Sequence, residues 1–192
     1  AYEQAIELQR KEGYKKLCIP DIATNLAHIY EIYSKDISKA LELLERQITD
    51  HPNKPWIGDN YTYCQYKKLV LLDGSLSDTD KENKLVAAFE QAVKLQGKEG
   101  YKVIQGSGMI TNLAHIYEVY SKDALKARRL LEDVIQEHPN KPWIANPYTY
   151  SQYKRLVLLD ESVPDSEKEE KLITAYEQAI ELQRKEGYKK LC

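Results

Sequence analysis

The fold is decided by the stretch Thr24-Asn-Leu-Ala-His-Ile-Tyr-Glu31, because it occurs again, unchanged, as Thr111 to Glu118. Around it the chain aligns with itself at an offset of 87 residues: positions 1–87 match positions 88–174 without a gap, and 53 of the 87 pairs are identical. Self-similarity at a fixed period is typical of stacked structural units that are each too small to bury an apolar face alone. The sequence therefore predicts a single tandem-repeat domain over residues 1–192.

A second repetition extends the pattern, since residues 1–18 recur without a change as residues 175–192. We therefore interpret the chain as two units, 1–87 and 88–174, followed by the start of a third unit at 175–192. The copy between them, residues 88–105, has diverged. Identical outer copies beside a diverged inner one leave two origins open, part of a natural array with a longer period or an engineered array.

The spacing of apolar residues within each unit predicts four amphipathic helices, arranged as two hairpins. In the first unit the first hairpin comprises Ile22–Tyr33 and Ile37–Asp50, and the second comprises Asn60–Asp73 and Asp80–Glu99. His51-Pro52 ends the first hairpin, because proline neither donates a backbone hydrogen bond nor continues a helix.

An opening helix over Ala1–Glu12 and a final one over Glu167–Glu186 bring the prediction to about nine helices. Alternating strand patterns joined by two-residue hairpin turns are absent from the sequence. The predicted fold class is all-α, built from antiparallel helical hairpins.

Composition and charge narrow the possible partners. The 192 residues include 28 Lys and Arg against 30 Asp and Glu, a net charge of -2 that gives no general attraction to nucleic acid or to an anionic membrane. No apolar run reaches the roughly 18 residues of a membrane span. The three cysteines suggest no disulfide framework, and the chain opens without a charged and then apolar leader. We expect a cytoplasmic protein with neither nucleic acid nor membrane as a partner.

The spacing of small and large residues resembles that of a known repeat. Ala40, Leu44, Gln47 and Pro52 follow the small–large–small–proline spacing of its second helix, and Leu26-Ala27 with Tyr30 follow the core of its first. These residues resemble the tetratricopeptide repeat. The hairpins are longer, about 43 residues rather than about 34, and are similar to the long variants of kinesin light chains.

The resemblance implies a right-handed α-solenoid, a superhelix whose first helices line a concave face that binds peptides or protein segments. Carried onto this sequence, the family's groove predicts two sets of binding residues, one in each unit. They are Asn25, His28 and Glu31 with Tyr63, and Asn112, His115 and Glu118 with Tyr150. Thr24 is expected on the same exposed side. The alternative reading is that the polar residues are solvated positions retained by duplication, and that the tyrosines belong to the core.

Catalysis and cofactors find no support in the sequence. His28 and Glu31 lie three residues apart on one helical face, but two ligands are too few for a zinc site. Gly106-Ser-Gly108 lacks the spacing of a phosphate-binding loop, and no Gly-x-Ser-x-Gly or Cys-x-x-Cys motif occurs. We expect a non-enzymatic protein without metal or cofactor.

Self-assembly is the alternative function. Because residues 1–18 and 175–192 are identical, the final helix of one chain could occupy the place of the opening helix of another, in a head-to-tail contact that forms rings or filaments. The residues expected at such a junction are Tyr2, Ile6 and Cys18 with their copies Tyr176, Ile180 and Cys192.

Overall fold

The computed structural model describes residues 3–4, 21–50, 60–95, 108–139 and 147–184. Within these ranges there are eight α-helices, one short π-helical turn and no strand, which confirms the all-α prediction. The chain divides into two compact units, Ala1–Gln105 and Gly106–Cys192. Each unit is described by itself below.

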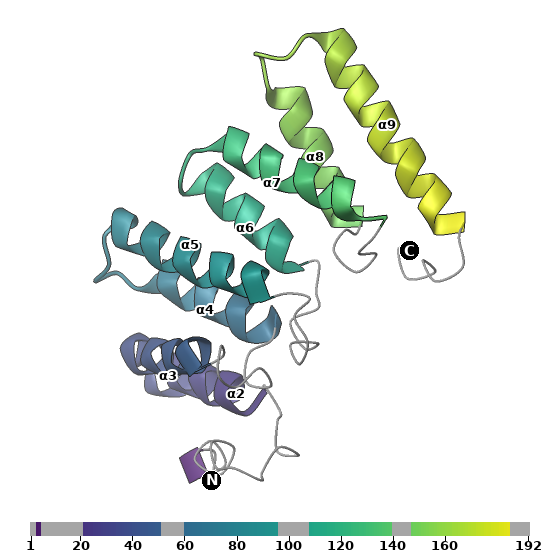
Figure 1. The fold of residues 1–192 in the computed structure, drawn as a ribbon. Helices are drawn as coiled ribbons and strands as arrows, with labels where there is room; N and C mark the ends of the chain where they lie inside the picture. The colour runs from purple at the N-terminus through teal and green to yellow at the C-terminus, as the bar shows by residue number, and fades with distance from the viewer. Residues whose placement is uncertain (1–2, 5–20, 51–59, 96–107, 140–146, 185–192) are drawn as a thin grey trace. The chain divides into compact units, whose positions relative to one another are not determined.

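The first unit contains two helical hairpins. The first hairpin consists of α2 (Asp21–Ile29), a π-helical turn (Tyr30–Ser34) and α3 (Ile37–Asp50); the second consists of α4 (Asn60–Leu72) and α5 (Asp78–Leu95) (Figure 1). Helix α4 packs against both helices of the first hairpin as well as against α5. The two hairpins therefore share one apolar core.

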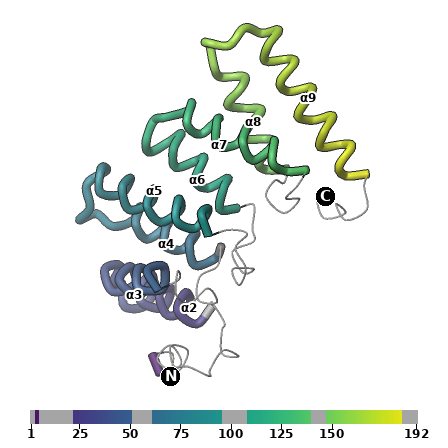
Figure 2. Tube along the Cα trace, viewed as in Figure 1, coloured from purple at the N-terminus to yellow at the C-terminus, as the bar shows by residue number. Residues whose placement is uncertain are grey.

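The second unit repeats this arrangement. It contains α6 (Gly108–Val119), α7 (Ala124–Glu137), α8 (Pro147–Leu159) and α9 (Asp165–Arg184). Helix α8 packs against α6, α7 and α9, and the trace in Figure 2 shows α8 running beside α9 as a hairpin.

The hairpin turns explain where the first helices stop. Lys35 adopts a left-handed conformation with φ 52°, and the N–H of Asp36 reaches back to the carbonyl of Tyr30 at 3.0 Å. Such a bond satisfies a carbonyl left without a partner at a helix C-terminus. The Asp36 carboxylate then accepts a bond from the N–H of Lys39 at 2.9 Å and caps α3. The second copy has the same turn around Lys122, with φ 53°.

Predicted and observed helix bounds agree closely in the first unit. Helix α3 has the predicted bounds, while α4 ends one residue early, at Leu72. Helix α5 begins at Asp78 rather than at Asp80, because Ser77 is its cap: the Ser77 hydroxyl accepts a bond from the N–H of Asp80 at 3.1 Å. Of the predicted opening helix over residues 1–12, only residues 3 and 4 are described, and both are helical.

The core consists of side chains from all the helices of a unit. In the first unit Leu44, Tyr63, Leu85 and Phe89 are fully buried, and the rings of Tyr63 and Phe89 meet edge to face at 5.7 Å. No helix in the described part of the chain is long and apolar enough to cross a membrane.

Candidate functional site

In the second unit a hollow of about 510 Å³ lies between α6 and α8, the first helices of its two hairpins. We call it the α6–α8 groove. Its residues are Gly108, Thr111, Asn112 and His115 from α6, and Tyr148, Ser151, Gln152 and Arg155 from α8. The structure thus brings together two of the predicted binding residues, Asn112 and His115, on one wall of a groove.

Helical periodicity places these side chains on the groove. Both walls have residues at the spacing i, i+3, i+4, i+7, which lie on one face of a helix. The opposite face of α6 has the buried residues Leu113 and Tyr117. Gly108 adds no side chain to the wall, whereas the corresponding position of the first unit is Asp21.

Arg155 at one end of the groove is tied to the neighbouring helix. Its guanidinium makes two hydrogen bonds to the two carboxylate oxygens of Glu118, so the pair joins α8 to α6. The bond to Glu118 raises the pKa of Arg155 against the opposing effect of burial. Paired Arg–carboxylate geometry of this kind fixes orientation as well as charge.

The first unit has the corresponding tie between α2 and α4. Lys68 Nζ lies 2.5 Å from one carboxylate oxygen of Glu31, and Gln65 Nε2 donates to the other at 2.8 Å. Burial alone would raise the pKa of the Glu31 carboxyl, but the hydrogen bonds from Lys68 and Gln65 outweigh it and hold the pKa below its ordinary value.

The prediction that Glu31 and Glu118 orient a ligand therefore needs correction. The side chains are only 7% and 14% exposed, and both carboxylates are bonded to a cation on the adjacent first helix. Their observed contacts hold neighbouring helices together. The signal in the sequence was the cation found at the same repeat position in each unit, Lys68 and Arg155.

The contacts of the Glu31 carboxylate with Lys68 and Gln65 predict that the stability of the fold is sensitive to acid. Because the pKa of Glu31 is lower in the folded than in the unfolded chain, its stabilisation is present above the unfolded value of about 4.3 and is lost as the pH falls through the folded value. Glu31→Gln is expected to lower the free energy of unfolding by about 1 kcal/mol at pH 7, since Lys68 is half exposed. Urea titrations of both proteins at pH 7 and pH 3 should show a smaller difference at pH 3. An equal difference at both pH values would refute the assignment.

Three other predicted groove residues are buried instead. Thr24 is 1% exposed, and its hydroxyl lies 3.1 Å from the hydroxyl of Thr62 on α4. Tyr63 is fully buried, and Tyr150 is 5% exposed with its hydroxyl 2.8 Å from Nδ1 of His138. Burial raises the pKa of Tyr150 to about 12. These positions pack the hairpins together, so the prediction that Tyr63 and Tyr150 line the groove is corrected: Tyr148 does so, with 75% of its surface exposed.

Asn25 and His28 lie on the exposed side of α2, as predicted. Nδ1 of His28 is 3.5 Å from the Glu31 carboxylate, which confirms that these two side chains share a face. Among the residues that the structure describes, no group of three or more His, Cys, Asp and Glu side chains is arranged to hold a metal ion.

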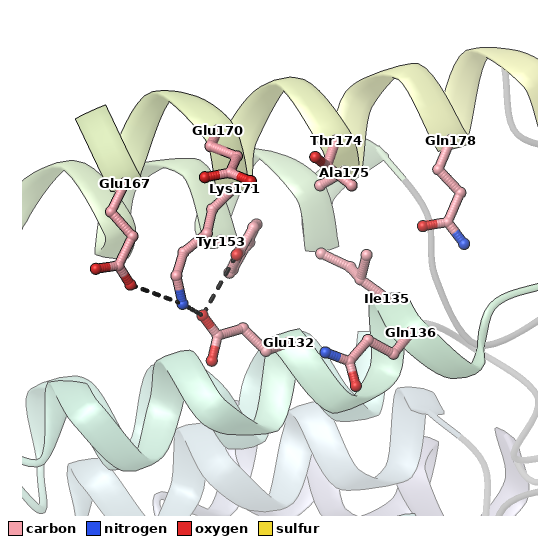
Figure 3. A pocket seen from close by; sticks show the side chains of 10 residues that line it. All are labelled: Glu132, Ile135, Gln136, Tyr153, Glu167, Glu170, Lys171, Thr174, Ala175 and Gln178. Atoms are coloured by element: carbon pink, nitrogen blue, oxygen red, sulfur yellow. Dashed lines mark hydrogen bonds and ion pairs between the residues drawn. The ribbon is translucent and has the colours of Figure 1, made fainter. Parts of the chain in front are cut away.

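A second hollow, of about 380 Å³, lies between α7 and α9 and was not predicted. Figure 3 shows Lys171 of α9 reaching across it to Glu132 of α7, with Nζ 3.4 Å from the carboxylate. The Tyr153 hydroxyl of α8 donates to the same carboxylate at 3.3 Å. Burial, followed by the charge of Glu132, raises the pKa of Tyr153 to about 12. Glu132, Tyr153 and Lys171 thus bond to one another across the hollow, which favours a role in joining α7, α8 and α9.

The residues predicted for self-assembly fall partly outside the described ranges. Tyr2, Ile6, Cys18 and Cys192 are in residues whose positions are not described. Tyr176 is half buried and its hydroxyl donates to the Tyr150 carbonyl at 3.3 Å, while Ile180 is 48% exposed.

Comparison of the chain with protein-family models, curated proteins and solved structures finds no match.

Proposed function

We propose that this protein is a non-enzymatic scaffold that binds a peptide or a protein segment, and that its hairpins stack as a right-handed solenoid of the tetratricopeptide type. The observation that carries the proposal is the α6–α8 groove, which combines a cavity of about 510 Å³ with the predicted residues Asn112 and His115. Grooves between first helices are where the resemblance places a ligand.

The chemistry of the groove suits an extended main chain. The amides of Asn112 and Gln152 and the hydroxyl of Ser151 are uncharged groups of the kind that pair with peptide N–H and C=O groups. Asn112 Nδ2 donates to the Gly108 carbonyl at 2.8 Å and the Gln152 amide lies 3.2 Å from the Thr111 carbonyl, so a bound segment would compete with these contacts. Arg155 is neutralised by Glu118, so a ligand carboxylate would have to compete for it. The groove therefore favours uncharged peptide segments.

The exposed ring of Tyr148 supplies the apolar contact. Tyrosine offers a large surface with few rotatable bonds, and residues of this type dominate the energy of many interfaces. Tyr148 lines the groove and is 75% exposed. We propose that it covers one side chain of the bound segment.

The proposal is tested by filling the groove. A random-peptide display library is selected against the full chain, and enriched peptides are synthesised and titrated by fluorescence anisotropy. Ser151→Trp places an indole in the groove from an exposed position of α8, so the fold should survive. We expect affinity to fall at least about 10-fold, because several groove contacts are lost together.

The matched control is Lys154→Trp, which adds the same side chain at an exposed position of α8 outside the groove. Its affinity should equal that of the unaltered chain. A library that yields no binder, or peptides that bind both tryptophan variants equally well, would overturn the proposal.

A further inference from the structure

An acidic side chain from residues 1–18 lies on the α2–α3 hairpin. The Tyr30 hydroxyl donates to Oε1 of Glu3 at 2.5 Å, and Lys39 Nζ of α3 lies 3.9 Å from the same oxygen. Lys39 also stands over the Tyr30 ring, 4.3 Å from its centroid. The bond from Tyr30 and the charge of Lys39 lower the pKa of Glu3. Tyr30 and Lys39 thus form a small binding site for a carboxylate.

The same acidic residue occurs in α9 within the same sequence. Residues 175–184, the second half of α9, are identical to residues 1–10, and Glu177 corresponds to Glu3. Glu177 is exposed, and no described residue is hydrogen-bonded or ion-paired to it. One turn further along α9, Ile180 presents an exposed apolar side chain.

Apolar surface also adjoins the carboxylate-binding site of Tyr30 and Lys39. Ile22 and Leu43 are partly exposed beside Tyr30, packed on the buried pair Ala23 and Leu26. The counterpart of Ile22 in the second unit is Met109, which is fully buried. A residue at this position of the repeat can therefore be buried completely. Ile22 in α2 still has exposed apolar surface that a partner could cover.

We propose that α9 of one molecule docks on the α2–α3 hairpin of a second copy of this chain, with Glu177 taking the place of Glu3 at Tyr30 and Lys39. The α2–α3 hairpin is proposed as the docking surface because Glu3 of the same chain already contacts it. Glu177 lies in a sequence identical to that around Glu3, so it can make the same contact. The two contact surfaces differ, so the contact is head-to-tail and continues into a ring or a filament.

Competition within each molecule sets the concentration at which assembly begins. Glu3 is tethered to its own hairpin, so it meets Tyr30 and Lys39 at an effective concentration on the order of millimolar. Assembly of the unaltered chain is therefore expected only at high protein concentration. Weakening the Glu3 contact should release the hairpin for a second copy.

Charge reversal in the full chain tests this competition, with the solution mass measured by light scattering over a wide concentration range. Glu3→Lys opposes Lys39 and should lower the concentration at half-assembly by about 5-fold, the range of a surface charge pair. Glu177→Lys should raise it by a similar factor, and the variant with both changes should assemble no more readily than the unaltered chain.

Ile180→Asp places a charge in the apolar part of the contact and should abolish assembly of the Glu3→Lys protein. Its control is Leu158→Asp, at an exposed leucine of α8 that should leave assembly unchanged. A mass constant at 22.3 kDa for both the unaltered and the Glu3→Lys chains would overturn the proposal. Assembly at the same concentration in the Glu177→Lys and Ile180→Asp variants would also overturn it. None of these variants touches the α6–α8 groove, so the two proposals fail independently.

Discussion

Leu131→Ala is expected to lower the free energy of unfolding of the second unit by about 2–5 kcal/mol. Leu131 lies in the middle of α7 with 0% of its surface exposed. Truncation removes three carbons from the core and leaves a cavity that the packed helices fill only in part. Urea denaturation followed by circular dichroism measures the change.

Two leucines serve as controls for this substitution. Leu44 is the counterpart in α3 and is also fully buried, so Leu44→Ala should have a similar cost in the first unit. Leu158 is 52% exposed, and Leu158→Ala should change stability by less than about 1 kcal/mol. Equal costs for Leu131→Ala and Leu158→Ala would contradict the burial described here.

Gln47→Val is expected to raise the free energy of unfolding by about 1–3 kcal/mol. Gln47 lies in α3 with 1% of its surface exposed, and neither polar atom of its amide is hydrogen-bonded within the described part of the chain. A buried polar group without a partner costs its desolvation free energy. Valine is the natural choice because Val134, 7% exposed, occupies the same position of the repeat. Differential scanning calorimetry should record a higher midpoint temperature.

The reverse substitution supplies the control. Val134→Gln places an amide in the corresponding part of the second core and should lower the free energy of unfolding by a similar amount. A Gln47→Val protein that is less stable than the unaltered chain would show that the glutamine amide has a partner.

The second helices of the hairpins could be predicted closely because their stop and start signals are local. Asp36 caps α3, and proline follows the last turn, so the bounds of α3 can be read directly from the residues. The π-helical turn at Tyr30–Ser34 could not be predicted in the same way. The nearly identical residues Tyr117–Ser121 of the second unit are followed by an equally left-handed Lys122 but are not a π-helical turn, so the local sequence does not mark it.

The groove was predicted only in part, for a reason of geometry. Periodicity places Asn112 and His115 on one face of α6, but it does not say which residues of α8 come opposite. Contacts between helices decide that, and they assign Glu118 to Arg155 and Tyr150 to the core. The resemblance placed Glu118 on the groove, whereas the cation that neutralises it lies 37 residues further along the chain.

The ion pairs between helices join residues that are near in sequence, which favours rapid folding. Glu118 and Arg155 are 37 residues apart, and the bond between Lys84 and Glu45 spans 39 residues. Each closes a modest loop, and the hairpins inside these loops form from still nearer neighbours. Chains dominated by such short-range contacts pay little loop-closure entropy before contacts form, and they fold in microseconds to milliseconds. Any hairpin could serve as the nucleus, with its neighbours adding to it in either direction along the chain.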